Sequence, residues 1–413
     1  LVRSISPALE RALAQFPVVV ISGARQTGKT TLVRGLAAPA GPRRYVTFDD
    51  LRHLDAAEKY PAGLIGEGPV TFDEVQRIPP FLSAVKQAVD ERRTPGRVLL
   101  AGSADRLQLK RSSERLAGRA TYLNLRPMTE SEKRGRPEDE RWSFMLGSAT
   151  IEDARSHAIY ATPKGAPIDW RRAVLEGGFP EAALNPDPAA RSRWFDAYAD
   201  TFVHRDMRDL ARVADLPAFL RLIRQVAMRT GKVLNAADLA ADCGLPRSTV
   251  ARWLERIEMS FLLTMLPAFY ESRGKRLIKA PKLYALDTGL ALHLSGATDA
   301  AAIDALPQRG VWLENLILND LLAWRDALGS RIEIYFYRTA DGREIDFVLE
   351  YGRRLLPIEV RAEENPRVDD GRFVAQFCRD YSDRAPFGLV LHTGSVVSTL
   401  GPDVLAVPIS NLL

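Results

Sequence analysis

Only two cysteines and five histidines occur among the 413 residues. Cys243 and Cys378 by themselves make neither a disulfide framework nor a zinc site, and the histidines are too widely spaced for a local metal motif. No apolar run approaches the roughly 18 residues of a membrane-spanning helix, and the first residues lack the charged start and apolar core of a signal peptide. We therefore expect a cytoplasmic protein in a reducing setting, with no membrane segment.

Neither positive nor negative charge is in large excess. The 57 Lys and Arg residues and 52 Asp and Glu residues leave a formal net charge of +5, which is weak evidence for an anionic partner unless the cations gather in one place. The 46% apolar and 26% charged residues are ordinary for a globular protein and exclude a disordered tail, a collagen and a coiled-coil rod. The length allows two or three domains.

Short apolar runs alternate with helical patterns over the N-terminal third of the chain. The runs lie at 18–22, 45–48, 70–73, 98–101 and 121–125. Several are continuous rather than alternating in polarity, which is typical of strands buried on both faces of a parallel sheet. With helical stretches such as 81–92 between them, they predict an α/β fold, a doubly wound parallel-sheet domain over 1–132.

The rest of the chain divides into four parts by composition and pattern. Gly, Pro, Ser and mixed charge dominate 133–168, which indicates a linker or surface insertion. A helical region over 169–230 precedes a winged helix-turn-helix at 231–300, and a smaller α/β domain occupies 301–413. Aromatic and apolar residues near helical spacing in the helical region are expected in its core: Trp194, Phe195, Tyr198, Phe202 and Met207. The strands expected in the last domain are 332–338, 344–349 and 355–360.

The octapeptide GARQTGKT at 23–30 follows the first apolar run and precedes a helical pattern. It matches GxxxxGK[ST], the phosphate-binding loop, in the context that this motif requires. Gly23 and Gly28 let the loop curl so that backbone N–H groups face a phosphate, Lys29 reaches the β- and γ-phosphates, and Thr30 binds Mg²⁺. The motif therefore predicts ATP and Mg²⁺ as ligands. The expected nucleotide-contacting residues are Gly23, Ala24, Arg25, Gln26, Thr27, Gly28, Lys29, Thr30 and Thr31.

The third apolar run begins with VTF at 70–72, and two acids follow, Asp73 and Glu74. Asp73 is expected to complete the magnesium site with Thr30. Glu74 is expected to polarise the water that attacks the γ-phosphate. This tandem pair favours hydrolysis over mere storage of the nucleotide.

Two further positions near the ends of later runs are candidates for catalysis. Ser103 follows the run at 98–101 and would contact the γ-phosphate or the water, although a helix N-cap explains it as well. Arg119 precedes the last run, where it would face the γ-phosphate of a neighbouring subunit. Arg115 competes for that role, and an ordinary surface arginine is the other interpretation.

These motifs together resemble the AAA+ superfamily of ATPases, and more closely a prokaryotic group within it. That group has a loop of the form GxRQxGKT, then FDEVQ, GSxxxxL and LAGR, and the stretches here are GARQTGKT, FDEVQRIPP, AGSADRL and LAGRATYLNLRPMTESE. The likeness continues through EGGFPEAAL at 176–184, HRDMRDL at 204–210 and KRLIKAPKLYALDTGLALHL at 275–294. It implies ATP binding and hydrolysis in the N-terminal domain, whereas the C-terminal half of the group is a domain of unknown function.

The helix-turn-helix pattern lies in LNAADLAADCGLPRSTVARWLERIE at 234–258. Its second helix has an apolar stripe of Val250, Trp253, Leu254 and Ile257. Ser248 and Arg252 point away from that stripe, as do the residues that contact DNA in DNA-binding versions of this motif. Glu255 shares their face and opposes phosphate binding.

A basic strip follows the second helix, in what we expect to be the wing. Between 273 and 282 the sequence has five cations and no acid. They are Arg273, Lys275, Arg276, Lys279 and Lys282. We predict that they contact nucleic-acid phosphates, with a log–log salt slope of roughly −4. The other interpretation is that the winged helix docks a protein or acts as a lid.

The last domain carries acids in the order helix, strand, strand. Glu314 lies in a helical pattern, Asp346 in EIDFVLE and Glu359 in LLPIEVR. This order resembles the PD-(D/E)xK nuclease pattern and implies three carboxylates around one cation, for phosphodiester hydrolysis. Related ATPases have a lysine where this sequence has Arg361, and an arginine cannot act as a base. We therefore expect a degenerate nuclease-like domain, in which Arg361 would still hold a phosphate.

The leading hypothesis is an AAA+-type ATPase that couples nucleotide turnover to binding or remodelling of a nucleic acid, with DNA favoured. The first alternative is an ATP-gated switch that binds protein partners. The second is an ATP-regulated, metal-dependent nuclease. Arg119 further predicts a homo-oligomer, with a hexamer as one possible form.

Overall fold

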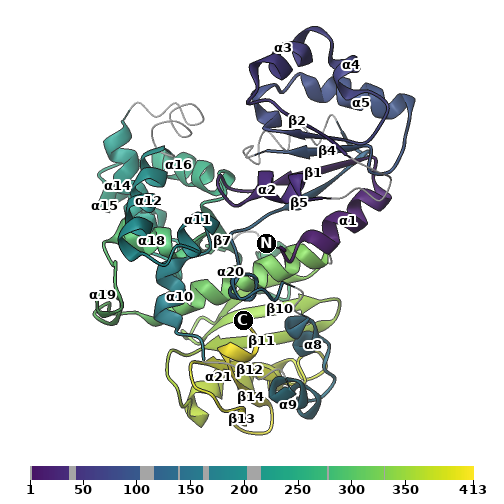
Figure 1. Ribbon diagram of the computed structural model, residues 1–413. Coiled ribbons are helices and arrows are strands. Elements are labelled where there is room, and N and C mark those ends of the chain that lie inside the picture. Colours follow the sequence, from purple (N-terminus) through teal and green to yellow (C-terminus); the bar gives the residue numbers. More distant parts are fainter. Residues whose placement is uncertain are drawn as a thin grey trace.

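The computed structural model describes residues 2–36, 43–102, 116–137, 140–160, 167–201, 215–276, 279–329 and 331–413. They form three sheets with helices packed around them (Figure 1). The N-terminal sheet lies at one end of the molecule and the largest sheet at the other. A long helix, α20 (Gly310–Leu328), crosses between them.

The N-terminal domain is the doubly wound α/β unit that the sequence predicts. Its strands are β1 (Val18–Ser22), β2 (Arg44–Thr47), β3 (Val70–Asp73), β4 (Val98–Ala101) and β5 (Ala120–Asn124). They form one parallel sheet in the order β2-β3-β4-β1-β5. The described helices around it include α1 (Ser6–Gln15), α2 (Lys29–Arg34), α3 (Leu51–Lys59), α4 (Pro61–Ile65) and α5 (Phe81–Glu91). Successive residues of β1 enter different apolar clusters, so the sheet is buried on both faces, as continuous apolar runs require.

The interpretation of 133–168 as a linker or surface insertion needs correction. A short helix, α7 (Glu130–Lys133), leads to α8 (Arg141–Gly147) and α9 (Ile151–Tyr160). Trp142, Met145 and Ala154 of these helices are buried in the core of the C-terminal domain, against β11 and β14. Polar residues dominate the composition of this stretch, but a few spaced apolar side chains suffice to anchor two short helices.

The middle of the chain is helical around a small antiparallel sheet. The helices are α10 (Trp170–Glu176), α11 (Pro180–Ala183), α12 (Pro188–Thr201), α14 (Leu216–Ala227), α15 (Ala236–Cys243), α16 (Arg247–Met259), α18 (Thr288–Ser295) and α19 (Ala300–Asp304). The sheet has β6 (Lys232–Val233), β7 (Leu263–Leu266) and β8 (Lys282–Ala285), in the order β6-β8-β7. Phe195 and Tyr198 lie in the core as predicted, with Trp194 packed against it. Phe202 and Met207 lie outside the described residues.

The C-terminal domain contains the six-stranded mixed sheet. Its strands are β9 (Glu333–Arg338), β10 (Glu344–Tyr351), β11 (Arg354–Val360), β12 (Gly388–His392), β13 (Ser398–Thr399) and β14 (Val404–Pro408). Their order is β13-β14-β12-β11-β10-β9, with β11, β12 and β14 parallel to one another. Helices α20 and α21 (Arg372–Asp380) pack on this sheet. The three strands predicted for this domain are therefore confirmed to within two residues at each end, and Glu314 lies in a helix, as predicted.

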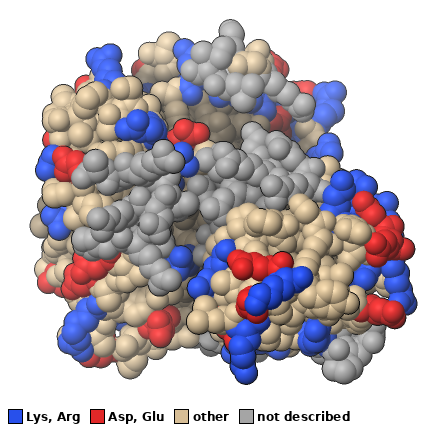
Figure 2. Space-filling model, turned by 90° about the horizontal axis from the view of Figure 1, so that it is seen from above, with Lys and Arg blue, Asp and Glu red and all other residues tan. Residues whose placement is uncertain are grey.

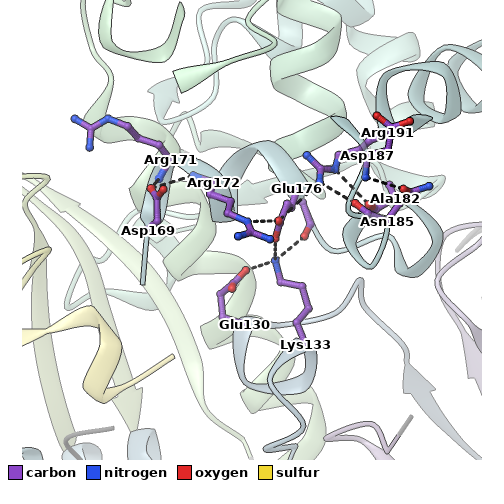
Figure 3. Close-up of polar contacts among 11 residues, drawn as sticks. Glu130, Lys133, Asp169, Arg171, Arg172, Glu176, Ala182, Asn185, Asp187 and Arg191 are labelled. Carbon is purple, nitrogen blue, oxygen red and sulfur yellow. Dashed lines mark hydrogen bonds and ion pairs between the residues drawn. The ribbon is translucent and has the colours of Figure 1, made fainter. Parts of the chain in front are cut away.

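Charged side chains join the N-terminal domain to the rest of the chain. Arg126, just after β5, pairs with Asp326 near the end of α20 at 2.7 Å. In Figure 3, Lys133 of α7 reaches toward Glu176 of α10, with an Nζ–carboxylate distance of 3.6 Å. Arg172 and Arg191 approach the same carboxylate at 2.6 and 3.7 Å. Of these three cations only Lys133 comes from outside the helical region, and because Lys133 and Glu176 are largely buried, their pair helps to hold α7 against α10 in a defined orientation.

Within the described ranges, no helix has both the length and the apolar character needed to cross a membrane. Cys243 and Cys378 are both buried and unbridged, in keeping with the expected absence of a disulfide framework.

Candidate nucleotide site and a buried carboxylate cluster

The loop at 23–30 connects β1 to α2 and adopts the curled backbone that its glycines permit. Gly28 has φ of 91° and Gly23 has φ of 149°. A Cβ at Gly23 would lie 2.2 Å from the backbone oxygen of Leu125, so no side chain fits there. Gln26 also has a positive φ, of 60°. The loop therefore has the shape of a cradle whose backbone amides are available to an anion.

Lys29 lies inside this cradle and is 5% exposed. Its Nζ donates to the backbone oxygens of Gly23 at 3.0 Å and Ala24 at 2.6 Å. Burial lowers the pKa of Lys29 to about 8, against the opposing charges of Glu74 and Asp73. The hydrogen bonds that the ammonium makes to described residues go to these two carbonyl oxygens, so a phosphate in the loop would be a stronger hydrogen-bond partner.

Thr30 and Asp73 meet at the carboxyl ends of β1 and β3, as the sequence predicts. The Thr30 hydroxyl donates to Asp73 Oδ2 at 2.7 Å. Tyr45 of β2 donates to the same oxygen at 2.7 Å, and burial together with Asp73 raises the pKa of Tyr45 to about 12. A hydroxyl and a carboxylate are hard oxygen ligands, so these two side chains fit a Mg²⁺ ion that also contacts substrate phosphates. The role of Tyr45 has no signal in the sequence.

Glu74 is held in an unusual backbone conformation directly after β3. Its φ of 57° is left-handed, which is uncommon for a residue with a side chain and is found at functional sites. Burial, and then the charge of Asp73, raise the pKa of Glu74. The side-chain amide of Gln76 donates a hydrogen bond to the Glu74 carboxylate. Gly102 lies against the other end of this amide, because a Cβ at Gly102 would be 2.4 Å from Gln76 Oε1. Gln76 is thus a positioning residue that the sequence analysis did not identify as such.

Two residues of the loop lie close to the helical region. Ala24 belongs to the same apolar cluster as Phe179, and a Cβ at Gly28 would lie 3.7 Å from Pro180. Arg3 donates to the backbone oxygen of Thr27 at 2.8 Å. The other predicted nucleotide-contacting residues differ in exposure: Gln26 and Thr31 are exposed, Arg25 and Thr30 are half-buried, and Thr27 is buried.

The other candidate catalytic residues are not brought to the loop. Ser103 and Arg115 lie outside the described residues. Arg119 precedes β5, and the parallel register places that end of β5 beside Val18, at the edge of the sheet opposite the loop. Its guanidinium pairs with Asp90 of α5 at 2.8 Å. Arg119 therefore does not reach the nucleotide site of its own chain, and a role toward a neighbouring subunit stays a prediction.

The helix-turn-helix forms as predicted, with α15 and α16 joined at Gly244, whose φ is 63°. The apolar stripe of α16 is buried: Val250, Trp253, Leu254 and Ile257. Ser248, Arg252 and Glu255 are exposed on the other face. A role for Ser248 and Arg252 toward nucleic acid stays a prediction.

The segment between β7 and β8 is not a free wing. Phe269 N donates to the oxygen of Phe336 at 2.6 Å, so the segment lies along strand β9 of the C-terminal sheet. Arg276 donates to Tyr335 Oη at 2.9 Å and to Glu350 Oε2 at 2.5 Å, and it is buried. The prediction that Arg276 contacts phosphates is wrong, because a buried carboxylate neutralises its charge.

Of the remaining four cations of the strip, the structure describes the side chains of Lys279 and Lys282. Lys279 is exposed, with its Nζ 6.0 Å from the centre of the Tyr270 ring. The side chains of Arg273 and Lys275 lie outside the described part of the chain. Lys282 is 2% exposed, so the prediction that its side chain contacts nucleic-acid phosphates at the surface is also wrong.

Lys282 instead enters the group of acids that the nuclease-like pattern identifies. Its Nζ lies 3.1 Å from Glu314 Oε1 and 3.9 Å from Asp346 Oδ1, and it also pairs with Glu344. Burial opposes the charge of Lys282, but these carboxylates outweigh burial and raise its pKa above the usual value. Burial and then Asp346 raise the pKa of Glu314 to about 7. We call Lys282, Glu314, Glu344, Asp346 and Glu359 the carboxylate cluster.

Glu359 completes the carboxylate cluster from β11. It pairs with Arg361 at 2.5 Å, and burial raises its pKa well above the usual value. The three predicted acids, Glu314, Asp346 and Glu359, are thus brought to one region. Across the described ranges, however, no three His, Cys, Asp or Glu side chains are arranged to hold a metal ion. The residues as placed do not fit the implied metal, because an ammonium stands among the carboxylates.

Comparison with known proteins agrees with the N-terminal geometry. Residues 15–133 match a family model described as an AAA domain. Two curated mycobacterial proteins, "Uncharacterized protein Mb2031c" of Mycobacterium bovis and "Uncharacterized protein Rv2008c" of Mycobacterium tuberculosis, are each 30% identical to this chain over 374 residues. The alignments cover 89% of this chain and 75% of each relative. This chain belongs to their family. As a member, it has an N-terminal AAA-type ATPase domain with a nucleotide-binding P-loop.

Two further family models match the chain beyond the AAA domain, and both describe domains of unknown function. Residues 168–301 match a domain of unknown function (DUF8612), and 309–412 match another (DUF4143). Among solved structures, the Walker-type ATPase PABY2304 of Pyrococcus abyssi is 16% identical, with a TM-score of 0.44, over 70% of this chain and 94% of that one. The strand order β2-β3-β4-β1-β5 and the AAA match identify the fold of the N-terminal domain.

Proposed function

We propose that the chain hydrolyses ATP at the loop 23–30 and couples this turnover to binding or remodelling of a nucleic acid, with DNA favoured. The observation that carries the hydrolysis is the joint placement of Thr30, Asp73 and Glu74 beside the buried Lys29. A site that only stored nucleotide would not need a strained acid beside the magnesium-binding pair.

The roles follow from the contacts. Lys29 exchanges its two carbonyl partners for phosphate oxygens, and Thr30 and Asp73 would hold Mg²⁺, which neutralises phosphate charge. Glu74, oriented by Gln76, accepts the proton of the water that attacks the γ-phosphorus. The bond from the γ-phosphorus to the bridging oxygen breaks as the new bond forms, and the products are ADP and inorganic phosphate.

The nucleic-acid partner is supported by fewer residues than the sequence suggested. Arg276 and Lys282 are neutralised inside the protein, whereas Ser248, Arg252 and Lys279 are exposed. On the face shown in Figure 2, basic and acidic side chains are interspersed and form no extended field of one sign among the described residues. Binding would therefore involve a limited set of contacts, with a modest salt dependence.

ATPase assays with and without nucleic acid test this proposal. Steady-state ATP hydrolysis is measured alone and with single-stranded DNA, duplex DNA, branched DNA or RNA, at about 50 mM salt, where phosphate contacts are strong. We expect turnover to rise with at least one of them, and the rise to vanish in Lys29→Ala. Turnover that no nucleic acid changes, together with no detectable nucleic-acid binding, would refute the coupling and favour the protein-binding switch.

Two further expectations belong to this proposal. The active form is an oligomer, a hexamer being one possibility, in which Arg119 reaches a neighbouring subunit. The protein works in the cytoplasm.

A further inference from the structure

Two hollows adjoin where the segment after β7 lies along β9. The larger, of about 1130 Å³, is lined by Tyr270, Lys279, Tyr337, Arg338 and Tyr381, among others. We call it the tyrosine groove. The smaller, of about 610 Å³, lies over the carboxylate cluster. Because Val233 and Arg338 line both hollows, the two form one continuous depression.

The aromatic wall of the groove is rigid and open to a ligand. Tyr337 and Tyr381 both rest against Phe377, with ring centres 5.0 and 4.5 Å from it. Tyr337, Tyr381 and Tyr270 are only half-buried. Among the described residues, their hydroxyl groups make no hydrogen bond. Aromatic rings fixed from behind and exposed in front are suited to stacking with a planar ligand.

The rim of the depression is basic. Lys232, Lys279 and Arg338 are exposed there, against one exposed acid, Glu271. Arg338 is 51% exposed at its side chain and lies 3.8 Å from the half-buried Glu344, too far for a strong pair. Cations that are not neutralised by close partners remain available to a polyanion.

The floor of the smaller hollow carries charges of both signs. Lys282 and Arg361 line it together with three acids of the carboxylate cluster, Glu314, Glu344 and Asp346. Glu359 precedes two lining residues, Val360 and Arg361, but does not itself line the hollow. It is 6% exposed, and its Oε2 atom has no hydrogen-bond partner within the described part of the chain. The basic rim and aromatic wall thus adjoin a group of buried, charged side chains.

We propose that the tyrosine groove binds a single-stranded nucleic acid, with its bases on Tyr270, Tyr337 and Tyr381 and its phosphates on Lys279 and Arg338. This inference rests on the proposed function, because it gives the nucleic-acid partner a place and a class. Stacking requires free base faces, which a duplex hides between its base pairs. A depression that presents both aromatic rings and cations matches an unpaired strand, which offers base faces and phosphates side by side.

Fluorescence anisotropy with a labelled 12-nucleotide oligo(dT) at low salt tests the charged part of the groove. The full chain is compared with the double variant Lys279→Glu/Arg338→Glu. The control, Arg193→Glu/Arg353→Glu, has the same change in charge at side chains that are 72% and 86% exposed and do not line the groove. We expect at least a tenfold weaker Kd for the groove variant and less than a twofold change for the control.

The aromatic part is tested with Tyr381→Leu and its matched control Tyr381→Phe. Loss of one stacking ring should weaken oligo(dT) binding about tenfold in the leucine variant, whereas the phenylalanine variant keeps the ring and its affinity. A circular dichroism melt checks that both variants are folded. The groove variants should hydrolyse ATP at the basal rate, since none of these residues lies at the nucleotide site.

The outcomes distinguish failure of the groove assignment from failure of the proposed coupling to nucleic acid. If the wild-type protein binds oligo(dT) and both groove variants bind equally well, the groove is not the site, and the proposed coupling to nucleic acid stands without it. If the protein binds only duplex DNA, the assignment to a single strand is wrong. If it binds no nucleic acid at all, the proposed coupling fails along with the groove.

Discussion

The lowered pKa of Lys29 predicts that nucleotide binding takes up a proton. The ammonium in the nucleotide-free loop has a pKa of about 8, because burial removes its water and only two carbonyl oxygens replace it. A triphosphate in the loop favours the charged form and restores a higher pKa. Only the protonated form binds tightly, so affinity falls as pH rises through the pKa of the free protein.

The magnitude follows from that value. With a pKa of about 8, Lys29 is about nine-tenths protonated at pH 7, about half at pH 8 and about one-tenth at pH 9. The apparent Kd for an ATP analogue should therefore rise about tenfold between pH 7 and pH 9. Binding at pH 8 should take up about half a proton per nucleotide.

Isothermal titration calorimetry with a non-hydrolysable ATP analogue measures both quantities. Titrations at pH 8 in two buffers of different ionisation enthalpy give the number of protons taken up. Lys29→Arg should bind with little pH dependence, since a guanidinium stays charged over this range. Lys59→Met, at an exposed lysine on α3, should keep the wild-type profile. A Kd that is flat from pH 7 to pH 9, with no proton uptake, would refute the assignment of Lys29 to the phosphate.

Three other perturbations have definite expected results. Lys133→Met removes the nearest cation of the buried Glu130 and one of three cations beside Glu176, so the free energy of unfolding should fall by about 3 kcal/mol, and an unchanged urea midpoint would count against these buried pairs. Lys282→Met removes a cation that lowers the pKa of Glu314, so this pKa should rise further in the variant. A carboxyl group whose pKa is higher in the folded than in the unfolded protein destabilises the fold as pH rises and the group ionises. The drop in Tm relative to wild type should therefore be larger at pH 8 than at pH 5, and a drop independent of pH would contradict the account. Mixing Arg119→Ala with Lys29→Ala should restore part of the ATPase activity if the arginine acts on a neighbour, whereas no recovery and a monomer by light scattering would exclude it.

The sequence was most informative where the pattern is local. Continuous apolar runs identified β1, β3 and β4, because a strand buried on both faces has few polar positions to obscure it. The runs at 45–48 and 121–125 identified β2 and β5, which are only partly buried. The loop 23–30 and the acids Asp73 and Glu74 were also identified, because each of these motifs consists of residues adjacent in the chain. Tyr45 was missed because its contact with Asp73 exists only once β2 and β3 pair.

The wing shows why a charge pattern alone misled. Five cations without an acid resemble a phosphate-binding strip, but the acids that neutralise Arg276 and Lys282 come from β10 and α20, far along the chain. The isolated arginine at 361 gave no hint that a lysine from β8 would stand among the acids of the last domain. Long-range pairing of this kind follows from how the domains pack, which no local periodicity encodes.

The most direct test of the central claim is hydrolysis by Glu74→Gln. Glutamine keeps the shape of the side chain but cannot accept a proton from water, while Lys29, Thr30 and Asp73 remain in place. We predict that the variant binds ATP within about twofold of wild type and hydrolyses it at least tenfold more slowly in a single-turnover assay. Hydrolysis at the wild-type rate with binding intact would remove Glu74 from the mechanism and contradict the proposed active site.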